Sequence, residues 1–159
     1  MDHLFAPDRM KYITEKKGEQ CIFCPNSGRE EDLVLYDGKY CFVILNKFPY
    51  TSGHVMIVPY RHICTPEDMQ LEEWLEMVRL TVRSVEVIKE VYKPGGFNIG
   101  MNVGKAAGAG IDCHLHMHIV PRWPGDTNFS TVIGGVRIIP QGLDEAQKRM
   151  RPHFEKMEV

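Results

Sequence analysis

The sequence predicts an α+β domain in which a mostly antiparallel sheet carries one long helix on a single face. Short β-rich runs bounded by turn residues occur on both sides of one long stretch of helical periodicity. The repeated strand–helix alternation that a doubly wound sheet requires is missing. With 159 residues, 43% of them apolar and 25% charged, the chain has the size and composition of one compact domain. We expect residues 1–159 to form that single domain, with short extensions at both ends.

The first part of the predicted sheet comes from three β-rich runs. Pro7 favours a short helix up to about Lys17 before them. Residues 33–37 and 40–46, with Gly38 between them, have the composition of a β-hairpin. A turn-rich segment then leads to a third predicted strand at residues 54–59.

One long helix is predicted to begin at residues 65–68 and to end before Pro94. Its start combines the capping hydroxyl of Thr65, a proline in the first turn and acidic residues at the positive end of the helix dipole. Apolar residues then recur at a spacing of 3.6, and we expect this stripe to face the core. The stripe consists of Leu71, Trp74, Leu75, Val78, Val82, Val85, Ile88 and Tyr92.

The rest of the sheet is predicted from residues 97–103, 114–122 and about 132–139, followed by a polar helical tail. Between the first two strands lies a loop, at residues 104–113, that is rich in glycine and alanine.

The most informative segment is the row of His114, His116 and His118, which alternate with apolar residues. Side chains on a strand point to alternate faces, so we expect the three imidazoles on one face, each roughly 6.5–7 Å from the next. A single strand histidine is usually a hydrogen-bonded bystander. A purely structural row of three is disfavoured, because neighbouring imidazoles repel when protonated and each needs partners when buried.

Two functions are open for this row: binding one metal ion, or catalysis by the central histidine. The loop before it, residues 102–110, is made of small residues apart from Asn102 and Lys105. Such a loop lets main-chain N–H groups approach an anion closely. It is neither a dinucleotide-binding fingerprint nor a P-loop, and by itself it is compatible with a flexible connection. Its position next to the histidines favours catalysis on a phosphate group.

Cys21 and Cys24 have the C-x-x-C spacing that allows two thiolates to bind one zinc ion. From the spacing alone, two buried thiols or a redox pair is about equally compatible, although the βαβ setting of a thioredoxin-like motif is missing.

The composition and the charge of the chain indicate where the protein is located and which partners it can bind. The five cysteines are an odd number, and the N-terminus does not have the pattern of a secretion signal, so we expect a reduced, cytoplasmic protein. No apolar run reaches the roughly 20 residues of a membrane span. The formal net charge of −2 gives no bulk attraction to nucleic acid or to an anionic membrane.

The histidine row resembles the signature of the histidine triad family of nucleotide hydrolases and transferases. Residues 45–59 are similar to the strand–turn–strand that holds the nucleoside in that family, and the resemblance extends over about residues 21–137. Residues 121–129 are most similar to microbial members that act on diadenosine polyphosphates.

The resemblance implies an enzyme that cleaves dinucleoside polyphosphates, such as diadenosine tetraphosphate, at the α-phosphate through a nucleotidyl-histidine intermediate. Hydrolysis and phosphorolysis are both open. A nucleoside phosphoramidate hydrolase, or a nucleotide-binding scaffold protein with incidental turnover, are the alternatives.

The resemblance also assigns roles to single residues. His116 matches the nucleophile, His118 a phosphate contact, Asn102 a side chain that holds the phosphate or the attacking histidine, and Asn46 a ribose or nucleobase contact. Main-chain donors to the phosphate are implied within Gly108, Ala109 and Gly110. Many relatives carry Gln, Ser or Thr just after the Ala-Gly pair, and this chain has only backbone there. This departure leaves the acceptor, water or inorganic phosphate, open.

The resemblance completes the metal site as well. It implies a structural zinc ion held by Cys21, Cys24, His62 and His114, and no organic cofactor. It further implies a homodimer, with the sheet extended across the two copies and the long helices at the interface.

Overall fold

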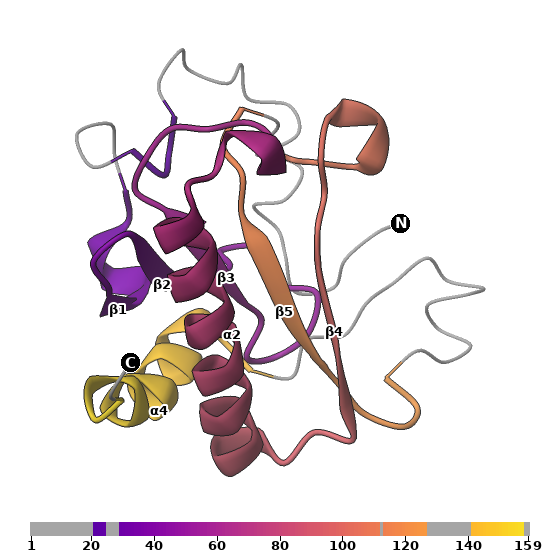
Figure 1. The fold of residues 1–159 in the computed structure, drawn as a ribbon. Coiled ribbons are helices and arrows are strands. Elements are labelled where there is room, and N and C mark those ends of the chain that lie inside the picture. The colour runs from indigo at the N-terminus through magenta and orange to yellow at the C-terminus, as the bar shows by residue number, and fades with distance from the viewer. Residues whose placement is uncertain (1–20, 25–28, 112, 127–140, 158–159) are drawn as a thin grey trace.

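The computed structural model describes residues 21–24, 29–111, 113–126 and 141–157. Five antiparallel strands form one sheet in the order β1-β2-β3-β5-β4 (Figure 1). This confirms the predicted α+β class with an antiparallel sheet. The helix expected at residues 7–17 and the strand expected at 132–139 lie outside the described residues. The strands are β1 Val34–Asp37, β2 Cys41–Leu45, β3 Val55–Pro59, β4 Gly96–Met101 and β5 Met117–Arg122.

Apolar side chains cover both faces of the central strands. Along β2, Val43 and Leu45 belong to the larger core cluster, whereas Phe42 and Ile44 belong to a smaller cluster on the opposite face. The larger cluster lies under the helices, and the smaller one includes Phe23 from the C-x-x-C segment. The C-x-x-C segment with Cys21 and Cys24 therefore packs on the face of the sheet away from the helices.

The long helix α2, Leu71–Tyr92, begins later than predicted. Pro66–Asp68 forms only a 3₁₀ turn, η2, because Met69 has an extended backbone that interrupts the helix. The hydroxyl of Thr65 donates to the Asp68 carboxylate at 2.8 Å, so it closes this turn instead of capping a helix. The main-chain N–H of residue 70 donates to the Glu73 carboxylate at 2.8 Å at the true start.

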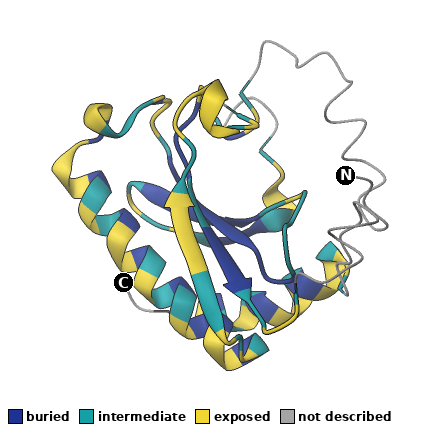
Figure 2. Cartoon of the chain, turned by 90° about the vertical axis from the view of Figure 1, so that its right-hand side faces the viewer, coloured by how far each residue is buried: buried dark blue, intermediate teal, exposed yellow. Residues whose placement is uncertain are grey.

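The predicted buried face of α2 was partly wrong. Trp74, Val85 and Tyr92 pack against the core, and Ile88 is fully buried, but the other half of the stripe is exposed. The exposed members are Leu71, Leu75, Val78 and Val82, at 50–69%. The residues of α2 that are buried in place of these four are Met77, Leu80, Ser84, Val87 and Val91. The helix thus has two adjacent apolar stripes, and exposed and buried positions alternate along it (Figure 2).

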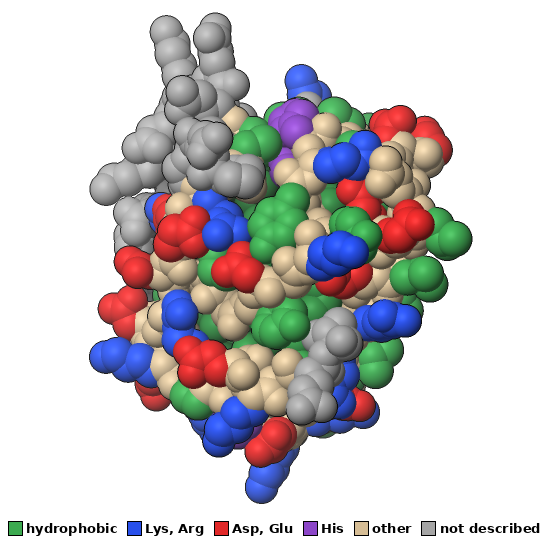
Figure 3. Space-filling model, turned by 60° about the vertical axis from the view of Figure 1, so that its left-hand side comes forward, with side chains coloured by type: hydrophobic (Ala, Val, Ile, Leu, Met, Phe, Trp, Pro, Cys, Tyr) green, Lys and Arg blue, Asp and Glu red, His purple; other side chains and the backbone are tan. Residues whose placement is uncertain are grey.

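The predicted helical tail is α4, Leu143–Glu155, which packs against β1 and α2. Met150 and Phe154 are fully buried in the larger core cluster, so this polar helix also has an apolar face. Among the described residues, no helix has both the length and the apolar character needed to cross a bilayer. Positive, negative and hydrophobic side chains are intermixed over the face shown in Figure 3.

Candidate active site

Strand β5 begins at Met117, so only His118 of the three histidines lies on a strand. The expectation that all three lie on one strand was wrong. The segment before β5 is held by other bonds: the N–H of Leu115 donates to the Ile63 carbonyl at 2.7 Å. As a result the rings of His116 and His118 approach to 4.7 Å between centroids, edge to face.

His116 is buried, with 5% of its surface exposed. Its Nδ1 lies 2.8 Å from the main-chain carbonyl of His114, which can only accept, so Nδ1 carries the proton. Burial lowers the pKa of His116, partly offset by that carbonyl. The ring is therefore neutral near pH 7, and Nε2 holds an unprotonated lone pair. This is the form of imidazole that can attack phosphorus.

His118 lies on the face of the sheet away from the helices, opposite Gly100 on β4. A pocket of about 360 Å³ opens over these strands, and its walls include His118 and Asn102. A Cβ added at Gly100 would meet no atom within 4 Å, so the pocket is open above the glycine. Arg122 also borders the pocket and is held by Asp126 at 2.6–2.7 Å and by Asn98 at 2.6 Å. The pocket thus combines an imidazole, an amide and a guanidinium.

The other predicted nucleotide contacts do not border this pocket in the described part of the chain. Asn46 lies against His54, with its Nδ2 3.3 Å from the ring Nδ1. The loop of small residues folds into a single 3₁₀ turn, η3 Lys105–Ala107, between two glycines with positive φ. Gly108 has a φ of +84° and open space where a Cβ would stand, so this glycine is required by its backbone conformation. Ala109 and Gly110 continue the loop beyond it.

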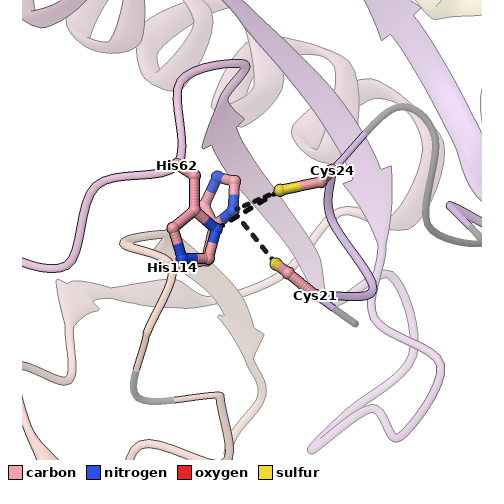
Figure 4. A group of neighbouring side chains, drawn as sticks. All are labelled: Cys21, Cys24, His62 and His114. Carbon is pink, nitrogen blue, oxygen red and sulfur yellow. Dashed lines mark hydrogen bonds between the residues drawn. The ribbon is translucent and has the colours of Figure 1, made fainter. Parts of the chain in front are cut away.

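Four side chains from three separate segments meet beside the histidines (Figure 4). Their ligand atoms all lie within 4.8 Å of one another, and they belong to Cys21, Cys24, His62 and His114. Cys21 Sγ is 3.2 Å from His114 Nδ1, and Cys24 Sγ is 3.3 Å from His62 Nδ1. His114 Nε2 donates to the Pro59 carbonyl at 2.8 Å, which leaves its Nδ1 as the ligand atom.

This donor set fits zinc. Two thiolates and two imidazoles are a common structural zinc set, and a tetrahedral ion would hold such atoms roughly 3.3–3.8 Å apart. Burial lowers the pKa of His114 to about 4, so its imidazole is neutral, as a metal ligand must be. Burial raises the pKa of the Cys21 thiol, a shift that a bound cation would oppose.

Sequence reasoning considered His54 only as a less favoured zinc ligand than His62 and His114, and the cluster does not include it. His54 is instead fully buried and lies 3.0 Å from His118. The only signal in the sequence was a histidine next to the apolar run of β3. Nothing in its spacing connects it to a residue 64 positions away.

The antiparallel α+β fold thus holds the buried ring of His116 beside the ring of His118, with the Cys₂His₂ cluster next to them. The HIT domain model matches residues 27–125, which is more than half of the chain. The chain therefore belongs to the HIT domain family.

Within this family the chain is similar to the AP-4-A phosphorylase of Mycobacterium tuberculosis, at 39% identity over 98% of this chain and 86% of that protein. It is 33% identical to the bis(5'-adenosyl)-triphosphatase of Saccharomyces cerevisiae, over 57% of this chain and 44% of that one. Its fold matches the crystal structure of a Zn-bound histidine triad family protein from Mycobacterium smegmatis. That match has a TM-score of 0.63 and 28% identity, and covers 78% of this chain and 84% of the other.

Proposed function

We propose that this protein cleaves dinucleoside polyphosphates, such as diadenosine tetraphosphate, at the α-phosphate through a nucleotidyl-histidine intermediate. The proposal depends mainly on the ring of His116, which is neutral, is held by the His114 carbonyl and has an unprotonated Nε2. The centroid of the His118 ring lies 4.7 Å from that of His116. The similarity to the AP-4-A phosphorylase over nearly the whole chain supports this substrate class.

In the proposed first step, Nε2 of His116 attacks the α-phosphorus and a P–N bond forms. The P–O bond to the remaining polyphosphate breaks, and the leaving nucleotide departs with that oxygen. His118 donates to a phosphate oxygen, where charge builds up, and Asn102 holds the phosphate. The loop at residues 108–110 supplies main-chain donors. In the second step water or inorganic phosphate attacks the same phosphorus, and His116 is released.

The name of the AP-4-A phosphorylase from Mycobacterium tuberculosis favours phosphorolysis as the second step, and product analysis with diadenosine tetraphosphate tests this expectation. With inorganic phosphate present, ADP plus ATP is the expected result, whereas AMP plus ATP indicates hydrolysis at the α-phosphate. Two molecules of ADP formed without phosphate uptake would contradict attack at that position.

His116→Asn is expected to abolish turnover and to keep substrate binding, which isothermal titration can measure. His153→Asn is the matched control, because this partly exposed histidine pairs with Glu90 on the helical side of the molecule. A His116→Asn enzyme with normal turnover would refute the assignment. A scaffold protein would instead keep its cellular role in that variant.

We also propose that Cys21, Cys24, His62 and His114 hold one structural zinc ion. When bound, the ion would fix His114, whose carbonyl holds the nucleophile, and would leave no position open for substrate. The purified protein should contain about one zinc per chain, and Cys24→Ser should lose it. Cys64→Ser, which changes a thiol outside the four-residue cluster, should keep it.

We further propose a homodimer, supported by the exposed stripe of Leu71, Leu75, Val78 and Val82 on α2. Ile99 on β4 is exposed at 47%, and β4 is an edge of the sheet that a second copy can extend. The odd number of cysteines remains the basis for the proposed cytoplasmic location.

A further inference from the structure

The pocket beside His118 continues along β4 and β5, which run side by side (Figure 1). Gly100 lies opposite His118, and Asn98 is two residues before Gly100 on the same strand. Opposite residues of an antiparallel pair share a face, as do alternate residues of one strand, so Asn98, His118 and Arg122 point to the pocket side. Asn98 is a diagonal neighbour of His118, at a distance of roughly 7–8 Å. The pocket therefore extends from His118 to a second group of polar side chains.

This second group offers hydrogen-bond donors. Nη1 of Arg122 donates to Oδ1 of Asn98 at 2.6 Å. A guanidinium can only donate, so the amide oxygen of Asn98 is turned towards Arg122 and its NH₂ group is turned away from it. Asn98 is exposed and the side chain of Arg122 is 40% exposed, and both border the pocket. A ligand at this end of the pocket thus meets an amide donor and a cationic one.

Asp126 orients the guanidinium. Its carboxylate accepts from Nε of Arg122 at 2.6 Å, from Nη2 at 2.7 Å and from the N–H of Trp123 at 3.1 Å. Both carboxylate oxygens are therefore engaged by Arg122. A ribose hydroxyl or a base amino group would need an acceptor here, whereas a phosphate group has only acceptor oxygens near neutral pH. The chemistry of this end of the pocket matches phosphate.

We propose that Asn98 and Arg122 form a subsite for the phosphates of the leaving nucleotide and so determine which phosphate chain lengths are cleaved well. This inference rests on the proposed function, in which the α-phosphate lies between His116 and His118. A phosphate held there does not reach the amide of Asn98, whereas the phosphates that follow it in the chain do. Negative charge builds up on the leaving group as its P–O bond breaks, and a guanidinium beside it stabilises that charge.

A purely structural role for Arg122 makes different predictions. Its pair with Asp126 would then only close the turn at residues 122–126, where Gly125 has a φ of +79°. Losing a structural contact would slow the cleavage of every substrate alike. Asn98→Asp separates the two roles, because a carboxylate still accepts from Arg122 but puts an acidic oxygen in place of the NH₂ donor.

The first test compares two substrates. Diadenosine tetraphosphate loses ATP as its leaving group, whereas adenosine 5'-phosphoramidate has a leaving group without phosphate. Arg122→Gln and Asn98→Asp should each lower kcat/KM for the tetraphosphate roughly ten- to a hundredfold, the effect of a lost hydrogen bond to a charged group. The value for the phosphoramidate should stay close to that of the wild type. Equal losses with both substrates would overturn the inference. Lys148→Gln on α4 changes the net charge by the same single unit and should alter neither value.

The second test needs no turnover. Isothermal titration of His116→Asn with ATP and with AMP, without magnesium, should show tighter binding of ATP. Adding Asn98→Asp or Arg122→Gln should weaken ATP binding roughly ten- to a hundredfold and leave AMP binding unchanged. An unaltered preference for ATP in a folded Asn98→Asp protein would contradict the inference, and this variant decides the question if Arg122→Gln does not fold. A wild-type protein that cleaves no dinucleotide would count against the proposed function, while the ratio of the two affinities still decides the subsite.

Discussion

Acidification should destabilise the fold through His118. The pKa of this imidazole is about 4 in the folded protein, because burial disfavours its charged form, and about 6.5 in the unfolded chain. Below pH 6.5 the unfolded state therefore binds more protons than the folded state. Stability is fully present above that pH and is lost as the pH falls from 6.5 towards 4. At pH 5 the two values correspond to about 2 kcal/mol, a large part of a typical total of roughly 5–15 kcal/mol.

Urea unfolding of the wild type and of His118→Gln at pH 7 and pH 5 measures this contribution. Glutamine does not titrate, so the variant should lose about 2 kcal/mol less than the wild type between the two pH values. Other acid-sensitive groups, including His114 and any zinc ligands, are common to both proteins and cancel. His153→Gln, at a partly exposed position on α4, should behave like the wild type.

Equal acid losses in the wild type and His118→Gln would refute the reasoning. His118 would then take up a proton as readily in the folded protein as in the unfolded chain. With an ordinary pKa, part of His118 would be imidazolium near pH 7, with protons on both nitrogens, and the donor role proposed for the neutral ring would apply only to the remaining fraction. An NMR titration of the His118 ring provides an independent check, with a midpoint near pH 4 expected.

Three further outcomes are expected. Gly53 has a φ of +76° and a Cβ there would stand 3.0 Å from the Tyr92 ring, so Gly53→Ala should lower the free energy of unfolding by about 2 kcal/mol. Gly108→Ala, at a φ of +84° in the left-handed region but in open space, should cost clearly less, and equal losses would deny the steric contribution. Removal of zinc by a strong chelator should lower both Tm and kcat, and re-addition of zinc should restore them; unchanged values would argue against a bound ion. Leu75→Glu should convert a dimer to a monomer in light scattering, whereas Lys148→Glu on α4 should not, and a dimeric Leu75→Glu protein would exclude this interface.

The strands were well predicted because period-2 patterns and turn residues are local signals. The face of α2 was not, since a helix with two adjacent apolar stripes has a periodicity that suits either orientation. Only tertiary packing decides that Leu80 contacts the sheet and Leu75 faces outward. The start of β5 was missed for a related reason: the alternation of His114–His118 continues past the point where the hydrogen bonds of the ladder end.

The metal cluster shows where sequence reasoning needs additional knowledge. The spacing of Cys21 and Cys24 predicted half of a site, and only family resemblance added His62 and His114. The structure brings all four side chains together. Spacing could not have done so, because the segments meet only after β3 and β5 have paired in an antiparallel register.

The polarity of the His116 and His118 imidazoles is harder still to predict, because it is set by main-chain groups. The N–H of Tyr50 donates to His54, and the carbonyl of His114 accepts from His116. Every residue except proline has the same N–H and C=O groups, so a pattern of side chains cannot predict these two bonds. A conservative change of the Tyr50 side chain would leave the donor to His54 intact, whereas a one-residue shift in the turn before β3 would remove it. The turn before β3 therefore bears on His118, through His54, whereas the main-chain carbonyl of His114 sets the polarity of His116.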